Sequence, residues 1–346
     1  MKIGFNLGQM FTYIDSKYGK QKNIPTDLYN KIIKETPNEW LENLRFSGTL
    51  SNYMNLHELG YGEYPETFQQ WNLLANRLSK KDQNKITSEI AKTALKKTLG
   101  FLGKAIKANT EEQNMKLLVD YTKQYVSSSY IVNFIETVKQ LKAKNISFTF
   151  NSHMPFRKLH TLEQSLSSLK YVKDRITISN IELENEGYDN AYIWEKHRDE
   201  YFKYLYDTVV PAITKIMGKS IPLGIPIAPH DEWYRYAEWN RKALELANKL
   251  KQEGYNPYIV AHIYPSINSN EELEKYVQFA ANTAKGFDVR ITEFNLSSDA
   301  KVKFSQEDTI NFIKNFAKIC SYYDNIVEIN YHSLWTQDGA HYSFIK

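Results

Sequence analysis

The amino-acid sequence predicts a (β/α)₈ barrel, and three observations support this prediction. Short β-rich runs alternate with long helical patterns from one end of the chain to the other, as in repeated β-α units around a parallel sheet. There are eight such runs. The first run contains Gly4 and leads to Gly8, but it carries neither the GxGxxG nor the GxxxxGK[ST] pattern of a nucleotide-binding open sheet.

Each predicted strand is a short β-rich run: Lys2–Asn6, Glu42–Phe46, Ile146–Phe150, Ile176–Leu183, Ile221–Ile227, Tyr258–His262, Val289–Glu293 and Ile326–Tyr331. Apolar residues that recur at three- and four-residue spacing predict the helices between them. These helices are Thr26–Glu35, Lys85–Lys107, Tyr130–Lys144, Asn190–Met217, Trp233–Glu253, Glu271–Ala284 and Gln306–Tyr322. No low-complexity linker or repeat divides the chain, so residues 1–346 are expected to form one domain.

Two segments depart from the regular alternation. Roughly a hundred residues separate the second and third strands, which is more than one β-α unit needs and predicts one or two extra helices or a lid there. After the eighth strand only His332–Lys346 remains, which is too short for a complete last helix and its loop. Either the chain is a fragment of a longer polypeptide, or another segment covers that flank of the barrel.

Composition excludes several classes of partner. The chain has 44 Lys and Arg against 40 Asp and Glu, and a net charge of +4 is too small to suggest nucleic acid. A single cysteine, Cys320, excludes an internal disulfide and a cysteine zinc site. The apolar runs are far shorter than the ~20 residues that span a bilayer, so no membrane partner is expected. The amino terminus lacks a signal peptide, so secretion would require a signal removed before residue 1.

Aromatic residues make up 14% of the chain, with 25 tyrosines and 6 tryptophans. Flat aromatic faces suit sugar rings, although abundant lysine, asparagine, isoleucine and tyrosine also mark an AT-rich genome. The sequence does not indicate an oligomeric state.

Two glutamates end predicted strands that lie three apart in the barrel. Glu186 follows the fourth strand and Glu293 ends the seventh, and active groups in such barrels lie at these carboxyl ends. A pair of carboxylates at one site is what cleavage of a glycosidic bond uses, one as proton donor and the other as nucleophile or base. Two different environments must keep their pKa values apart. Either glutamate alone would be an ordinary loop residue.

Arg45 and Tyr264 are candidates for supporting Glu293. Arg45 ends the second strand and is expected to pair with Glu293 and keep that carboxylate ionised, because a nearby cation favours the charged form. Tyr264 is expected to donate a hydrogen bond to the same carboxylate. The simpler alternatives are an interstrand salt bridge for Arg45 and barrel packing for Tyr264.

Further polar and aromatic residues lie near other strand ends. Asn185 is expected to bind a substrate hydroxyl, and Trp335 to form a platform under the sugar at the cleavage point. His153, His262 and His332 are expected to line the pocket. A turn residue, a packed tryptophan and ordinary core or surface imidazoles are the alternatives.

The motifs at these strand ends resemble a known clan. The sequence ELENE at Glu182–Glu186, ITEF at Ile291–Phe294 and Trp335 are similar to the large clan of retaining (β/α)₈ glycoside hydrolases that place two glutamates on strands four and seven. Many members read ELGNEP at the first site. LRFSGT at Leu44–Thr49 resembles the LRxGGT of the arabinofuranosidase, xylosidase and heparanase-like branches.

The resemblance implies a role for each matching residue. These are Glu186 as acid/base, Glu293 as nucleophile, Asn185 as partner of the 2-hydroxyl, Arg45 and Tyr264 as supports of the nucleophile, and Trp335 as floor of the subsite. The chain departs from the pattern at Ser47, at Glu184 and at Gly187. Glu184 has the strand parity of Glu186, so it is expected either to face inward and add a carboxylate or to be covered by Lys or Arg.

The resulting hypothesis is a retaining glycoside hydrolase that cleaves an oligo- or polysaccharide by double displacement and needs neither a metal nor an organic cofactor. The alternative from another class is an inactive carbohydrate-binding or structural protein on a glycosidase-like barrel, which the altered ELENEG sequence and the missing last helix keep open. A metal-dependent hydrolase is disfavoured, because the histidines show no HxH or HExxH spacing.

Overall fold

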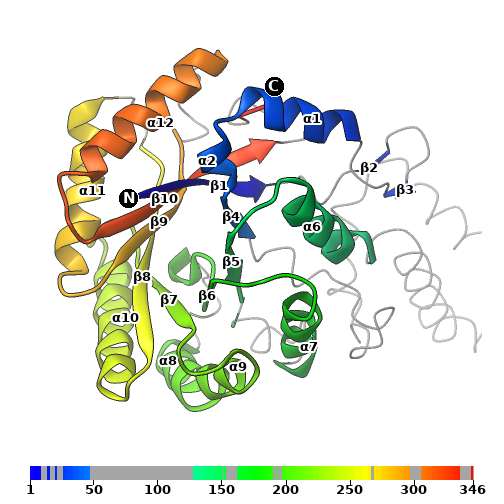
Figure 1. Ribbon diagram of the computed structural model, residues 1–346. Helices are drawn as coiled ribbons and strands as arrows, with labels where there is room; N and C mark the ends of the chain where they lie inside the picture. Colours follow the sequence, from blue (N-terminus) through cyan, green and yellow to red (C-terminus); the bar gives the residue numbers. More distant parts are fainter. Residues whose placement is uncertain are drawn as a thin grey trace, which may run out of the picture.

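The computed structural model confirms a closed barrel of eight parallel strands (Figure 1). It describes residues 1–8, 14–15, 20–21, 26–46, 128–150, 152, 162–189, 193, 197–265, 269–296, 305–335 and 344–345. The order around the barrel is β1, β10, β9, β8, β7, β6, β5 and β4, and β4 pairs with β1 to close it. Helices surround the strands, as in a TIM barrel.

The barrel strands are β1 (Lys2–Gly8), β4 (Asn43–Phe46), β5 (Asn145–Thr149), β6 (Asn180–Glu182), β7 (Pro222–Pro226), β8 (Asn256–Ile263), β9 (Val289–Phe294) and β10 (Ile326–Trp335). All eight lie where the sequence predicts strands. A small antiparallel pair that the sequence pattern does not predict, β2 (Ile14–Asp15) with β3 (Lys20–Gln21), follows β1.

The fourth strand is shorter than predicted. The prediction began it at Ile176, but the N–H of Ile176 donates to the carbonyl of Val172 at 3.0 Å and so closes the end of a helix. That helix, α7 (Leu162–Lys173), was missed because its sequence is rich in serine, a weak helix former. β6 therefore begins only at Asn180.

The helices of the described residues are α1 (Thr26–Glu35), α2 (Asn38–Leu41), α6 (Ser128–Gln140), α7, α8 (Arg198–Tyr204), α9 (Val210–Met217), α10 (Tyr234–Gln252), α11 (Asn270–Thr283) and α12 (Gln306–Cys320), with a 3₁₀ turn η4 (Gly187–Asp189). The predicted Lys85–Lys107 helix, and with it the expected extra helices after the second strand, lie outside the described residues.

The predicted helix Asn190–Met217 is not one regular α-helix. A π-helical turn, η6 (Leu205–Val209), separates α8 from α9, and the N–H of Val210 bonds to the carbonyl of Leu205. Pro211 follows immediately; it lacks an N–H and its ring crowds the carbonyl four residues earlier, so the wider turn relieves that contact.

Another segment covers the flank where a last helix would lie. Within the described residues no helix follows β10. The backbone N–H groups of Phe344 and Ile345 donate to the carbonyls of Ser333 (2.9 Å) and Leu334 (3.0 Å) at the end of β10. The ring of Phe344 lies 4.9 Å from Phe5 and 6.4 Å from Trp40 of α2, so this segment and α2 close the flank together.

The two faces of each strand have different neighbours. Phe294, on the outer face of β9, stacks on Phe316 of α12 at 4.2 Å. Glu293, one residue earlier, therefore faces the barrel interior. That interior is polar: at the opposite end of the barrel Arg290 lies 3.3 Å from Glu328. Alternation along the strands thus delivers charged side chains into the barrel and apolar ones to the helices.

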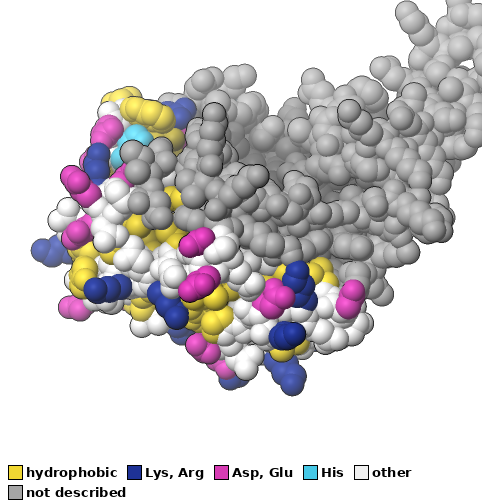
Figure 2. Space-filling view, turned by 90° about the horizontal axis from the view of Figure 1, so that it is seen from above, with side chains coloured by type: hydrophobic (Ala, Val, Ile, Leu, Met, Phe, Trp, Pro, Cys, Tyr) yellow, Lys and Arg dark blue, Asp and Glu magenta, His cyan; other side chains and the backbone are white. Residues whose placement is uncertain are grey.

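No helix in the described part of the chain is long and apolar enough to cross a membrane. Figure 2 shows positive and negative side chains interspersed over the described surface in that view, without a large area of one sign.

Candidate active site

The candidate site lies inside the barrel, toward the carboxyl ends of its strands. Strand register places its residues side by side: Asn6 of β1 lies opposite Arg45 of β4 and His332 of β10, and His262 of β8 lies opposite Glu293 of β9. These neighbouring strands thereby bring polar side chains from the whole length of the chain to one level of the barrel.

An irregularity between β8 and β9 shapes the centre of the site. Ala261 pairs with Ile291 and His262 with Glu293, so Thr292 is an extra residue on β9. Bulges of this kind re-aim side chains and are common beside active sites. The fully buried Thr292 places its hydroxyl 3.2 Å from Nε2 of His262, and Glu293 turns toward the same imidazole.

Glu293 is buried among donors. Its Oε1 pairs with Nη1 of Arg45 and accepts from the amide of Asn6 at 3.0 Å, while its Oε2 accepts from the Tyr264 hydroxyl at 2.5 Å. Burial by itself would raise the pKa of Glu293, but the charges of His262 and Arg45 outweigh it and hold that pKa well below its usual range. Glu293 is therefore ionised at neutral pH.

Arg45 is held mainly by a second glutamate. Its Nη2 lies 2.7 Å from Oε2 of Glu182, and its Nε lies 2.9 Å from both carboxylate oxygens. Both side chains are fully buried. Burial opposes the charge of Arg45, but Glu182 and Glu293 raise its pKa well above its ordinary value. Glu182 thus fixes the guanidinium that faces Glu293.

Glu186 lies in a different environment. It occupies the loop after β6 with a positive φ of 50°, a backbone conformation that few residues other than glycine adopt. Its side chain is 36% exposed, against 7% for Glu293. Its Oε1 lies 2.9 Å from Nδ1 of His262. One glutamate is thus buried against a guanidinium, and the other is reachable from solvent.

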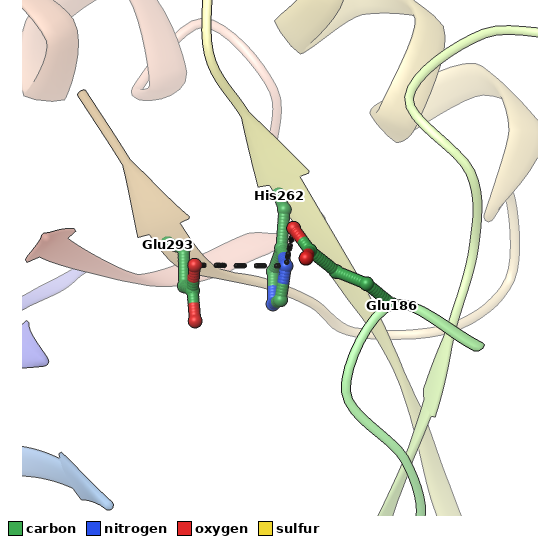
Figure 3. Close-up of side chains that lie close together, drawn as sticks. All are labelled: Glu186, His262 and Glu293. Carbon is green, nitrogen blue, oxygen red and sulfur yellow. Dashed lines mark hydrogen bonds and ion pairs between the residues drawn. The ribbon is translucent and has the colours of Figure 1, made fainter. Parts of the chain in front are cut away.

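His262 stands between the two glutamates (Figure 3). Its Nδ1, which contacts Glu186, is also 3.9 Å from Oε2 of Glu293. Burial alone would lower the pKa of His262, but the charge of Glu293 and the hydrogen bond to Glu186 raise it. Each of the three residues offers an atom within 4.8 Å of the others, so an oxygen of Glu186 lies within 4.8 Å of an oxygen of Glu293.

Among the described residues, these three form the group of side chains that could together hold a metal ion. Arg45 argues against this use, because its guanidinium already pairs with Glu293 and lies 3.4 Å from the other nitrogen of His262. A divalent cation would have to share that carboxylate with a fixed positive charge. The donor set therefore suits carboxylate chemistry better than metal binding.

The remaining sequence-predicted residues fall into two groups. Asn185 joins the site, since its Oδ1 accepts from Nη2 of Arg45 at 2.9 Å, and His332 places Nδ1 3.9 Å from Oε2 of Glu293. Burial lowers the pKa of His332. His153 lies outside the described residues, and so does the side chain of Trp335 at the end of β10.

The expectation that Glu184 faces inward is wrong. Its carboxylate is fully buried and accepts from the Tyr201 hydroxyl of α8 at 2.8 Å and from the backbone N–H of Asn185 at 2.8 Å, so it points to the helix layer. The reason is that β6 ends at Glu182, so strand alternation no longer applies two residues later.

Sequence reasoning missed three residues of the site: Asn6, Glu182 and Thr292. Asn6 and Glu182 are polar residues each flanked by two apolar residues of a strand region (Phe5 and Leu7, Ile181 and Leu183), which is a readable signal of an inward-facing position. Thr292 enters through the β9 bulge, for which the sequence carries no signal.

No family model matches the sequence, and no curated protein does. Among solved structures, a glucosidase from Croceicoccus marinus matches with a TM-score of 0.45 and 14% identity over 64% of this chain and 49% of that one, about half its length. The catalytic domain of Thermobifida fusca endoglucanase Cel5A (E355Q, with cellotetraose) matches at TM-score 0.38 and 9% identity over 63% and 76% of the two chains. A β-glucosidase from Pyrococcus furiosus matches with a TM-score of 0.35 and 11% identity over 68% of this chain and 64% of that one.

These structural neighbours are glycoside hydrolases. Their identities to this chain are too low for their activities or substrates to be transferred to it.

Proposed function

We propose that the protein is a glycoside hydrolase that cleaves an oligo- or polysaccharide with retention of anomeric configuration. The observation that carries the proposal is the approach of Glu186 and Glu293, whose nearest carboxylate oxygens lie within 4.8 Å across His262. Retaining enzymes hold their two carboxyl groups about 5–5.5 Å apart, whereas inverting enzymes separate them by about 6.5–9.5 Å to admit a water.

In the first step Glu293 is the nucleophile. Its carboxylate attacks the anomeric carbon, the bond to the leaving oxygen breaks, and that oxygen takes a proton from Glu186. Arg45 and Tyr264 support this role, because both favour the ionised form of Glu293. Glu186 in turn takes a proton from the His262 imidazolium, whose Nδ1 lies 2.9 Å from its Oε1, so the imidazole is neutral once the leaving group has departed.

In the second step Glu186 acts as the base. It removes a proton from a water molecule, whose oxygen attacks the anomeric carbon and displaces Glu293. The exposure of Glu186 suits this step, because the residue must reach both the leaving group and incoming water.

The test is the intact mass of the protein after incubation with a panel of 2-deoxy-2-fluoro glycosides. These reagents form the glycosyl-enzyme but release it slowly. We expect a mass gain of one sugar with at least one reagent, and no gain for the Glu293→Gln variant, which keeps the shape of the side chain.

Absence of any gain across the panel, with sugar binding still measurable by titration, would contradict the proposal. That result would favour the alternative, an inactive carbohydrate-binding protein on the same barrel.

A further inference from the structure

Two aromatic side chains are exposed at the mouth of the barrel, beside the candidate site. Trp233 is 52% exposed and Tyr234 is 75% exposed. Trp233 immediately precedes α10, the helix that follows β7, so both residues lie at the carboxyl-terminal face where the loops after the strands gather. The flat apolar faces of these side chains are thus available to a ligand at this end of the barrel.

The Trp233 ring packs against neighbouring side chains. It lies 4.9 Å from the ring of His230 and 4.9 Å from the ring of the buried Tyr236. The guanidinium of Arg235 lies 5.2 Å from the centre of the Trp233 ring and 4.8 Å from that of Tyr236. A ring fixed in this way loses little further freedom when a ligand packs against it.

This cluster is tied to the loop that carries Glu186. Asp189 accepts hydrogen bonds from the Tyr236 hydroxyl and, at 3.1 Å, from Arg235. The backbone N–H of Asp189 in turn donates to the carbonyl of Glu186 at 2.9 Å. The aromatic cluster therefore lies on the Glu186 side of the site, away from Glu293 on β9.

We infer that Trp233, with Arg235 and Asp189, forms a subsite for a sugar ring on the leaving-group side of the scissile bond. This inference rests on the proposed function, in which Glu186 protonates the leaving oxygen. The apolar face of a sugar would stack on the indole, and its hydroxyls would meet Asp189 and Arg235, whose side chains are 48% and 37% exposed. The leaving group is then itself a saccharide.

The experiment separates the leaving-group side from the glycosyl side. A 2-deoxy-2-fluoro glycosyl fluoride, of the sugar class that labels the protein, loses fluoride ion as Glu293 bonds to the anomeric carbon. An added acceptor then releases the enzyme: its hydroxyl attacks that carbon, the bond to Glu293 breaks, and the acceptor proton passes to Glu186. The rate of release against acceptor concentration measures binding on the leaving-group side.

The acceptors are the methyl glycosides of cellobiose, xylobiose and laminaribiose. For Trp233→Ala we expect an unchanged rate of labelling and a half-saturating acceptor concentration about tenfold higher, because the variant loses roughly 50 Å² of apolar contact. Trp233→Phe, which keeps a flat ring, should recover most of the affinity. Tyr322→Ala is the matched control, since Tyr322 is 61% exposed and follows α12 at the other end of the barrel.

The two claims fail in distinguishable ways. Failure of the unmodified protein to label refutes the proposed function. If the protein is labelled but the rate of release depends on acceptor concentration in the same way in Trp233→Ala and Tyr322→Ala, only the subsite is refuted. The same conclusion holds if the acceptor does not change the rate of release at all.

Discussion

Glu293 stays ionised in a buried position because its neighbours oppose the effect of burial. Arg45 and Tyr264 each contact one of its carboxylate oxygens, and His262 adds a nearby positive charge. Glu182 contributes indirectly, since it fixes Arg45. The nucleophile is therefore set up by residues of three strands, β4, β6 and β8, and of the loop after β8, rather than by any one partner.

Removing the Tyr264 hydroxyl should weaken this arrangement. Tyr264→Phe removes a donor to the charged form, so we expect kcat/KM to fall about 10–100-fold, as for loss of a hydrogen bond to a charged group. The pKa of Glu293 should rise, so the acid limb of the pH profile of kcat/KM should move to higher pH. Tyr258→Phe, which removes a buried hydroxyl near the other end of the barrel, is the control; an unchanged acid limb in Tyr264→Phe would contradict this role.

Glu186 can be tested through the leaving group. Glu186→Gln should lower kcat/KM by about 10²–10⁴-fold for saccharide leaving groups, which need a proton. Dinitrophenyl glycosides need none, so their first step should be nearly unaffected. Kinetics on both substrate types check this, and equal losses on both would exclude Glu186 as the acid.

His262 should make stability depend on pH. Its folded pKa lies above its ordinary value of 6.5, so the stabilisation from its protonated form is complete below pH 6.5 and is lost as the pH rises through the folded pKa. Glu293 behaves oppositely: its contribution is present above its ordinary pKa of 4.5 and is lost as the pH falls toward its lower folded pKa. The free energy of unfolding should therefore be largest between the ordinary pKa of Glu293, 4.5, and that of His262, 6.5.

The His262→Gln variant should lose less Tm than the unmodified protein between about pH 6 and about pH 9, because only the latter gives up the protonated imidazole. His197→Gln, at a half-buried histidine of the helix layer, is the control. Parallel Tm curves for the unmodified protein and His262→Gln would show that His262 is not protonated in the fold.

At the scale of elements, the β9 bulge and the turn after β6 do most to shape the site. The bulge brings Thr292 and Glu293 to His262, and the turn carries Glu186 at positive φ. Gly187 allows that turn, because a Cβ there would lie 2.6 Å from the Trp239 ring. Neither feature follows from hydrophobic periodicity, which explains why the sequence located both glutamates but misjudged Glu184 between them.

Glu184 should stabilise the turn through Tyr201. Because the hydroxyl of Tyr201 is buried against the Glu184 carboxylate, Tyr201→Phe should cost about 1–3 kcal/mol of unfolding free energy. The Glu184→Gln and Tyr201→Phe changes should couple by about 0.5–3 kcal/mol in a double-mutant cycle measured in urea. Additive effects would show that the contact contributes nothing to stability.

At the scale of the whole molecule, alternation of strand and helix patterns was sufficient to predict the closed barrel and the position of each of its strands. Segments outside that alternation were not predicted: α7 has a serine-rich sequence, and β2 with β3 has only two residues a strand. Of the site, the residues at or just after the carboxyl ends of strands were predictable, as Arg45, Tyr264 and Glu293 are. The inward position of Thr292 and the outward direction of Glu184 were not, because a bulge sets the first and a turn the second.

The closing segment Phe344–Ile345 should matter for the stability of the whole barrel. Phe344 is fully buried against β1, α2 and β10, so Phe344→Ala should lower the free energy of unfolding by about 3–5 kcal/mol. Urea denaturation measures this. Tyr322→Ala, at an exposed aromatic side chain, should lower the free energy of unfolding far less. Equal losses in the two variants would mean that Phe344 does not stabilise the flank of the barrel.

The role of Glu293 as the nucleophile is tested most directly by the position of the sugar in the trapped glycosyl-enzyme. Proteolysis followed by tandem mass spectrometry would locate it. We predict attachment to Glu293, within the peptide that contains Ile291–Phe294. Attachment to Glu186 or Glu182, or a first product of inverted configuration, would contradict the roles assigned to the two carboxylates.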